Sequence, residues 1–256
     1  MNRLLIILSI LFLFSSCDSW IDVKPENQVT YTNYFETEKD VEGAAFQMFA
    51  AECAYIGCEG DYLKWLGMLA DEWTDTYNAP RLGRASDLAN GWGESGWKNS
   101  YDIVFLANTI LENASRADMP KDRLNFWMGQ ASFTKGLAYF ELARTFGDAV
   151  ITRNSTSLEK YGRKPMLEVI DTAIVNAVKA YNLLPLFEDL KNLSGAAITS
   201  KQYACKGAAA ALLAHLYAWW GSVIELYGLE GDASDDYQKS IDYCTLILDK
   251  KVGFYE

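Results

Sequence analysis

The sequence predicts an all-α fold of tetratricopeptide-like helical hairpins in a right-handed stack with long irregular loops. Half of the 256 residues are hydrophobic, which is enough to build a sizeable core. Apolar residues recur at helical spacing, most strongly over residues 130–146. Helix starts near residues 165, 199 and 234 are separated by roughly the 34 residues of a tetratricopeptide hairpin. An unrelated all-α bundle would keep the helices and lack the repeat.

Residues 1–16 have the pattern of a lipoprotein signal peptide. Arg3 gives a basic start, and the apolar run 4–14 is too short to span a bilayer as a permanent helix. Phe14-Ser15-Ser16-Cys17 then places small residues before a cysteine that would be lipidated and become the mature N-terminus. A lipid on Cys17 would anchor the chain to a membrane without spanning it. The alternative is an ordinary secretory peptide with a chance cysteine.

We expect residues 17–36 to form a lipidated N-terminus and extended linker, and residues 37–256 to form the helical domain. Thr37, followed by acidic residues, starts the first helix. A second short helix is expected near residues 62–70. The apolar pattern then predicts further helices at 97–111, 121–146, 165–184, 199–220 and 234–248.

The ends of these helices are marked by residues with known positional preferences. Gly147 can close the 121–146 helix, and Pro165 suits the first turn of the next one. Thr199 or Ser200 is expected to cap the following helix, and Ser234 or Asp235 the last. Within the 121–146 helix, Gly136 and Ala138 allow another helix to approach closely.

The charge and the residue inventory exclude several classes of function. A net charge of −11 argues against a nucleic-acid partner. His215 is the one histidine and is expected to be a packed or snorkelling helix residue, so the sequence offers almost nothing from which to build a Ser-His-Asp or Cys-His site. No cofactor or metal site is predicted, because the cysteines after the signal lack zinc-binding spacing; they are expected to be buried free thiols. These cysteines are Cys53, Cys58, Cys205 and Cys244.

Residues 71–96 lack helical periodicity. A connection this long inside a compact domain is usually functional. Its acidic residues Asp71, Glu72 and Asp75 could suggest a glycosidase, yet such enzymes hold two carboxylates across the sugar at a defined separation. Three acids within five loop residues provide no such arrangement. The sequence therefore does not predict an enzyme.

Five segments in order resemble the SusD/RagB family of outer-membrane, nutrient-binding lipoproteins. They are YFETEKDVEGAAFQMF, WKNSYDIVFLANTILEN, KGLAYFELARTFGDAVI, KPMLEVIDTAIVNAVKAYNLLP and TSKQYACKGAAAALLAHLYAWW. The resemblance implies a cell-surface protein with a tetratricopeptide-like helical scaffold that binds glycans, or sometimes peptides. It also implies a partner, a TonB-dependent, SusC-like transporter that the protein covers like a lid. Family members are considerably longer, so residues 37–256 are expected to be a SusD-like domain truncated relative to the family.

The resemblance also implies ligand contacts in the irregular loop before Trp97. An aromatic ring stacks on the apolar face of a sugar, while neighbouring polar groups bind its hydroxyls. The expected ligand-binding residues are Trp73, Tyr77, Arg81, Asn90 and Trp92. The alternative for Trp73 and Trp92 is that they pin the loop to the scaffold.

Three functions remain in order of preference. The first is an outer-membrane lipoprotein that captures oligosaccharide at the cell surface and delivers it to the transporter. The second is a tetratricopeptide-like adaptor lipoprotein that binds only protein and has no ligand site of its own. A secreted glycoside hydrolase is the least favoured.

Overall fold

The computed structural model describes residues 34–58, 94–157 and 159–254. The signal peptide, most of the linker, the helix expected at 62–70 and nearly all of the loop 71–96 lie outside these residues. Within them, the α-helices are α2 (Glu38–Cys53), α5 (Glu94–Asn113), α6 (Lys121–Phe146), α7 (Met166–Leu183), α8 (Lys206–Tyr227) and α9 (Ala233–Leu248). The shorter elements are η2 (Ala54–Cys58), η4 (Ala114–Arg116), β1 (Ala149–Val150), β2 (Arg163–Lys164) and η5 (Phe187–Asp189).

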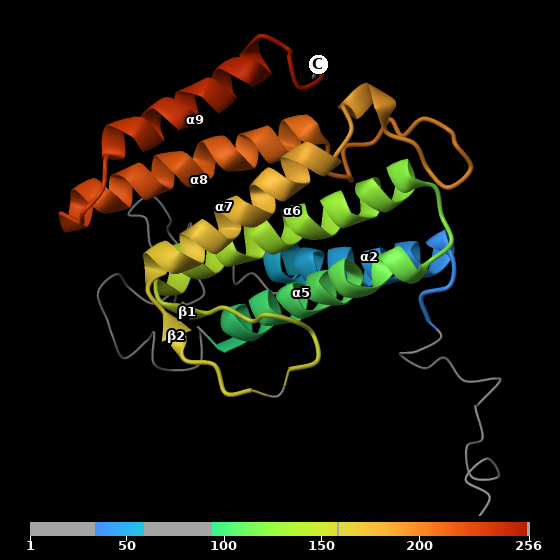
Figure 1. The fold of residues 1–256 in the computed structure, drawn as a ribbon, viewed down its shortest axis with the longest axis horizontal. Coiled ribbons are helices and arrows are strands. Elements are labelled where there is room, and N and C mark those ends of the chain that lie inside the picture. The colour runs from blue at the N-terminus through green and yellow to red at the C-terminus, as the bar shows by residue number, and fades with distance from the viewer. Residues whose placement is uncertain (1–33, 59–93, 158, 255–256) are drawn as a thin grey trace, which may run out of the picture. The chain divides into compact units, whose positions relative to one another are not determined.

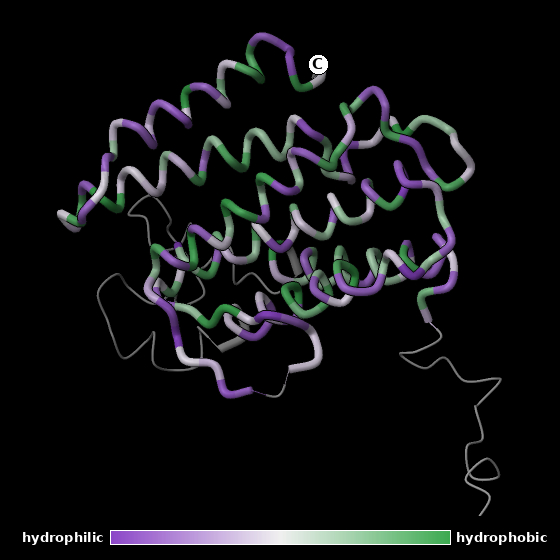
Figure 2. The backbone as a smooth tube through the Cα atoms, in the orientation of Figure 1, coloured by the Kyte–Doolittle hydropathy of each residue, from purple (hydrophilic) through white to green (hydrophobic). Residues whose placement is uncertain are grey.

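The helices from α5 onward pack in the order of the chain. Each of α5, α6, α7 and α8 contacts the helix that follows it, and α2 contacts α5 and α6 (Figure 1). This arrangement confirms the predicted all-α fold of sequential helical hairpins. The only sheet in the described part of the chain is the antiparallel hairpin β1–β2, in which Ala149 pairs with Lys164. Figure 2 shows that β1 is hydrophobic and β2 hydrophilic.

Helix α6 is the central element of the stack. It is buried over most of its length and contacts α2, α5 and α7. Gly136 lets α7 approach, because a β-carbon there would lie 3.1 Å from the Ala173 carbonyl oxygen and 3.2 Å from the Ala177 nitrogen. Gly147 ends α6 with a positive φ of 72°, as predicted. The close approach and the stop signal were therefore both visible in the sequence.

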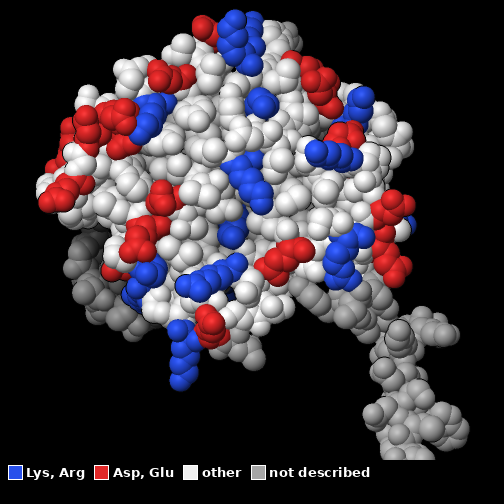
Figure 3. Space-filling model, in the orientation of Figure 1, with Lys and Arg blue, Asp and Glu red and all other residues white. Residues whose placement is uncertain are grey.

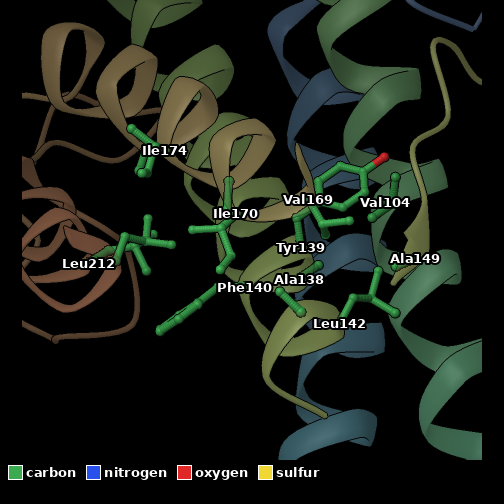
Figure 4. Close-up of a cluster of buried hydrophobic side chains, with 14 of the residues drawn as sticks. Val104, Ala138, Tyr139, Phe140, Leu142, Ala149, Val169, Ile170, Ile174 and Leu212 are labelled. Carbon is green, nitrogen blue, oxygen red and sulfur yellow. The ribbon is translucent and has the colours of Figure 1, made fainter. Parts of the chain in front are cut away.

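The largest buried cluster joins α6 to α7 and α8. Figure 4 shows Ile170 of α7 pointing toward both Phe140 of α6 and Leu212 of α8. Tyr139 and Leu142 extend the same cluster toward α5. Because the apolar contacts are continuous from α5 to α8, the helices share one core.

The first described helix, α2, is joined to α6 by a partly buried ion pair. Asp40 accepts a hydrogen bond from the Thr37 backbone nitrogen at 2.7 Å, so the predicted start of α2 is confirmed. One carboxylate oxygen of Glu38 accepts from Arg123 Nε at 2.6 Å and from Trp127 Nε1 at 2.9 Å. These contacts fix the first turn of α2 against the start of α6.

Helix α8 begins later than predicted. The sequence suggested a cap at Thr199 or Ser200, but the helix starts at Lys206. The side chain of Gln130 donates to the Ala204 carbonyl at 2.7 Å and accepts from the Ala204 nitrogen at 3.0 Å. These bonds hold Ala204 outside the helix, and the evenly spaced helix starts that were predicted are not observed.

Two other expectations need correction. Asp232, rather than Ser234 or Asp235, caps α9, because its Oδ1 accepts from the Ser234 nitrogen at 3.0 Å. Cys205 is buried as expected, whereas Cys53 and Cys244 are free thiols and are exposed. The side chain of Cys58 lies outside the described set.

Helix α8 is long and apolar enough to cross a membrane by composition alone. More than half of its apolar window is buried, and α7 and α9 pack against it. We therefore interpret α8 as a core helix of the stack.

Replacing Gly136 by alanine is expected to destabilise the fold. Alanine favours a helix over glycine by roughly 0.5–1 kcal/mol, but overpacking against the α7 backbone costs about 1–3 kcal/mol. We expect the unfolding free energy, measured by urea denaturation, to fall. Gly162→Ala is the control, because a β-carbon there meets nothing within 4 Å. Equal or greater stability of Gly136→Ala would contradict the close approach.

Candidate functional site

The segment 59–93 contains all the predicted ligand residues and lies outside the described residues. Trp73, Tyr77, Arg81, Asn90 and Trp92 therefore remain predictions. The chain enters this segment from η2 and leaves it into α5, and these two elements are in contact. We call η2, the first turns of α5 and the parts of α6 and β1–β2 beside them the loop base.

The loop base begins with an irregular helix. The π-helix η2 directly continues α2. Tyr55 is buried in it, and Ile56 is 39% exposed. Short π-helical turns are rare in proteins, and those that exist are often found at functional sites. Here the π-helical turn marks the end of α2 from which segment 59–93 departs.

A small pocket lies between η2, α5 and α6. Its volume is about 40 Å³, which is room for roughly two or three water molecules. Ligand pockets usually measure roughly 300–1,000 Å³, so no sugar ring fits inside. The lining residues are Glu52, Tyr55, Ile56, Ile103, Thr134, Leu137, Ala138 and Glu141.

Both carboxyl groups in this pocket are engaged. Burial raises the pKa of Glu52, although the Thr134 hydroxyl, which donates to it at 3.3 Å, opposes the shift. Burial also raises the pKa of Glu141, whose two oxygens each accept from Arg144 Nη2 at 2.8 Å. A glycosidase needs two carboxyl groups on either side of a bound sugar. This recess has no room for the sugar, so the pair does not form such a site.

The arginine partner of Glu141 also lies against aromatic rings. The Arg144 guanidinium is 4.7 Å from the ring centre of Phe140 and 5.9 Å from that of Trp219. His215 is an exposed residue of α8 whose ring lies edge-on to that of Phe140 of α6, with 4.9 Å between ring centres. Burial, and then the Arg144 charge, lower the pKa of His215. These contacts connect the pocket to α8.

Trp97, at the start of α5, is the centre of an aromatic cluster. Its ring lies 5.1 Å from that of Tyr101 and 5.2 Å from that of Phe146. The Arg163 guanidinium of β2 sits over the indole at 4.9 Å. Trp97 and Tyr101 pack against the core.

Two tyrosine hydroxyls bind the backbone of the segment that follows α6. Tyr101 Oη donates to the Val150 carbonyl at 2.9 Å and accepts from the Val150 nitrogen at 2.7 Å. Tyr139 Oη accepts from the Thr152 nitrogen at 3.1 Å. Burial raises the pKa of Tyr101 to about 12, so it stays protonated. The sequence did not predict these three bonds, because each joins residues from separate elements.

A larger groove lies between the α7–α8 connection and the described end of the chain. Its volume of about 480 Å³ is within the usual range for ligand pockets. The residues along it combine two aromatic rings with charged and polar groups. They are Phe187, Glu188, Ala197, Ile198, Thr199, Lys201 and Phe254. None of them was predicted as a ligand residue.

Comparison with known families supports the assignment made from the sequence. Residues 19–218 match a family model described as SusD-like and as starch-binding, associating with the outer membrane. The matched range includes segment 59–93 and most of the helical stack. No curated protein sequence matches the chain significantly.

Solved structures share the fold. A SusD homologue from Bacteroides thetaiotaomicron matches 88% of this chain and 43% of its own, with a TM-score of 0.66 and 16% identity. A SusD-like protein from Bacteroides fragilis matches 87% of this chain and 40% of its own, with a TM-score of 0.66 and 18% identity. A laminarin-binding SusD-like protein matches 73% of this chain and 41% of its own, with a TM-score of 0.56 and 17% identity. The chain thus spans less than half the length of these structures.

The raised pKa of Glu52 makes its ionised form unfavourable in the folded state. A carboxyl with a raised folded-state pKa stabilises the fold at low pH, and this stability is lost as the pH rises through that pKa. We expect Glu52→Gln to be more stable than the parent protein at pH 7 in urea unfolding. The difference should fade as the pH falls toward 4.5, the ordinary pKa of glutamate.

An exposed glutamate provides the control for this experiment. Glu230 lies on the α8–α9 turn, and Glu230→Gln should change stability little at either pH. A Glu52→Gln protein that is less stable at pH 7 would show that the carboxylate stabilises the fold.

Proposed function

Because the chain belongs to the SusD-like family, we propose that it captures oligosaccharide at the outer-membrane surface and delivers it to a TonB-dependent, SusC-like transporter. The family match over residues 19–218 carries this proposal. The family description gives starch binding and outer-membrane association, and it does not include catalysis. The oligosaccharide and the transporter are our inference for this chain.

We place the ligand contacts in segment 59–93. Trp73, Tyr77 and Trp92 would offer rings to the apolar faces of sugars, and Arg81 and Asn90 would bind hydroxyl groups. Two features of the loop base support this choice. Its own pocket is too small for a sugar, and the Trp97 ring is already covered by Tyr101, Phe146 and Arg163.

Trp92→Ala is expected to weaken oligosaccharide binding without unfolding the protein. Loss of one stacked ring should reduce the binding free energy by about 0.5–1.5 kcal/mol, which raises Kd about 2- to 10-fold. Calorimetric titration with maltohexaose and laminarihexaose measures the affinity, and a thermal melt measures the midpoint. We expect the midpoint to fall by no more than a few degrees.

The matched control removes an exposed aromatic ring elsewhere. Phe105 on α5 is 52% exposed, and Phe105→Ala should leave Kd unchanged. If Trp92→Ala lowers the midpoint sharply while the folded fraction binds normally, Trp92 is a packing residue. The groove beside Phe187 would then be the next ligand site to test.

We also propose that Cys17 carries the lipid that attaches the chain to the outer membrane. Cys17→Ser should abolish labelling by radioactive palmitate and move the protein out of the membrane fraction. Cys53→Ser is the control, because Cys53 is an exposed free thiol within the helical domain. If Cys17→Ser keeps the label, the lipid is on another residue and Cys17 is not the point of attachment.

A protein-binding adaptor is the second candidate. The last described helix favours it, because Ile241 is 56% exposed and Leu248 is 80% exposed on α9. Apolar side chains exposed in this way are typical of surfaces that bind other proteins. Retained binding to a transporter, together with no heat change for any of a panel of oligosaccharides, would favour the adaptor.

A further inference from the structure

The groove beside Phe187 has the size of a ligand site. Its volume is about 480 Å³, whereas the loop-base pocket of about 40 Å³ has room only for water. Residues of the α7–α8 connection, between 187 and 201, form one wall, and Phe254 forms the other. No lining residue belongs to segment 59–93. The proposed function therefore leaves this groove unassigned.

Backbone contacts hold the two walls of the groove together. On the first wall, the Ile198 nitrogen donates to the carbonyl of the buried Leu190 at 2.9 Å. On the second wall, a β-carbon on Gly253 would lie 3.2 Å from Glu188 Oε2 and 3.4 Å from the Phe187 nitrogen. The φ of Gly253 is 113°, which favours glycine. The walls are therefore fixed relative to each other.

Both walls carry an aromatic ring. Phe187 is partly buried on the first wall, and Phe254 is 44% exposed on the second. The Lys250 ammonium lies 4.1 Å from the centre of the Phe254 ring. Because Lys250 does not line the groove, it covers this ring from outside. The groove thus offers aromatic surface on two sides, which suits the apolar face of a sugar ring.

Polar groups beside Phe187 have spare hydrogen-bonding capacity. Among the described residues, the Glu188 carboxylate has no ion pair or hydrogen bond, and the Thr199 hydroxyl has no hydrogen bond. A carboxylate accepts hydrogen bonds from hydroxyls, and a threonine hydroxyl both donates and accepts.

The charges along the groove are balanced. Lys201 contributes one positive charge and Glu188 one negative charge to the lining. Figure 3 shows acidic and basic side chains mixed over the upper right of the molecule, where Figure 1 places the α7–α8 connection. An acidic ligand would meet Glu188, and a basic ligand would meet Lys201. The lining therefore favours a neutral ligand.

We propose that this groove binds one ring of a neutral oligosaccharide. Phe187 and Phe254 contact the apolar faces of the sugar, and Glu188 and Thr199 bind its hydroxyls. A neutral sugar combines apolar C–H surface with many hydroxyls, and both find a counterpart in the lining. The choice of a saccharide rests on the proposed function. The groove is a second binding site, in addition to the aromatic residues of segment 59–93.

Fluorine NMR observes this site separately from segment 59–93. The segment contains no phenylalanine, so the signals of 4-fluorophenylalanine at positions 187 and 254 report on the groove. Phe187→Leu and Phe254→Leu assign them. We expect at least one of maltohexaose, laminarihexaose, cellohexaose and mannohexaose to shift both signals saturably. The signal of Phe46, which is 50% exposed on α2, should not move.

Substitutions in the groove should weaken the binding measured at the Phe187 signal. Phe254→Ala removes an aromatic ring and Thr199→Val removes a hydroxyl, and each should raise Kd about 2- to 10-fold. Phe46→Ala and Thr156→Val are the matched controls, because both residues are exposed and neither lines the groove. The controls should leave Kd unchanged.

A second sample, labelled with 5-fluorotryptophan, tests the proposed function independently. Trp73 and Trp92 lie in segment 59–93, and no tryptophan is among the described residues that line the groove. If the hexasaccharides shift these tryptophan signals but not those of Phe187 and Phe254, the proposed function stands and the groove site is wrong. If only the phenylalanine signals shift, the groove site is supported and the ligand contacts of the segment are not.

Two further results would overturn the groove site. The first is an equal rise in Kd for Phe46→Ala and Phe254→Ala, which would make the effect of the ring nonspecific. The second is a shift of the Phe187 and Phe254 signals by acetyl-Ala-Leu-Ala-amide at a lower concentration than any of the hexasaccharides. That result would make the groove a contact for apolar peptides.

Discussion

The approach of α7 to α6 at Gly136 is the contact on which the rest of the stack depends. There the backbones of the two helices come close enough that no β-carbon fits without displacement. This approach brings Ile170 against Phe140, and α8 and α9 follow α7 in turn. On its other sides α6 holds α2 and α5, the two helices that flank segment 59–93 along the chain. One glycine therefore aligns both halves of the described structure.

The loop base is held by polar groups that are nearly all in use. Tyr101 and Tyr139 bind the backbone after α6, Arg144 binds both oxygens of Glu141, and Arg163 covers Trp97. Groups engaged in this way have little capacity left to bind a ligand. A firm base with few free polar groups is suited to positioning residues that lie outside it.

The sequence predicted the helices and their order because apolar periodicity and stop signals are local. The Thr37 start, the Gly147 end and the role of Gly136 could each be read from a few neighbouring residues. The late start of α8 could not, because it depends on hydrogen bonds from Gln130, 74 residues away. The contacts of Tyr101 at the loop base and of Glu38 at the start of α2 likewise join separate elements. The aromatic ligand residues were inferred from composition and family resemblance, and the structure does not describe them.

The contact between Gln130 and Ala204 has a further consequence. A side-chain amide gives Ala204 the two hydrogen bonds that a neighbouring strand would otherwise provide, and the Lys206 nitrogen donates to the Pro185 carbonyl at 2.8 Å. The starting point of α8 is thus set by α6 and by the end of α7, not by the length of the connection between them. Insertions or deletions in the exposed residues 191–197 can be absorbed without shifting α8. This connection is therefore a place where a reporter or a binding loop could be inserted.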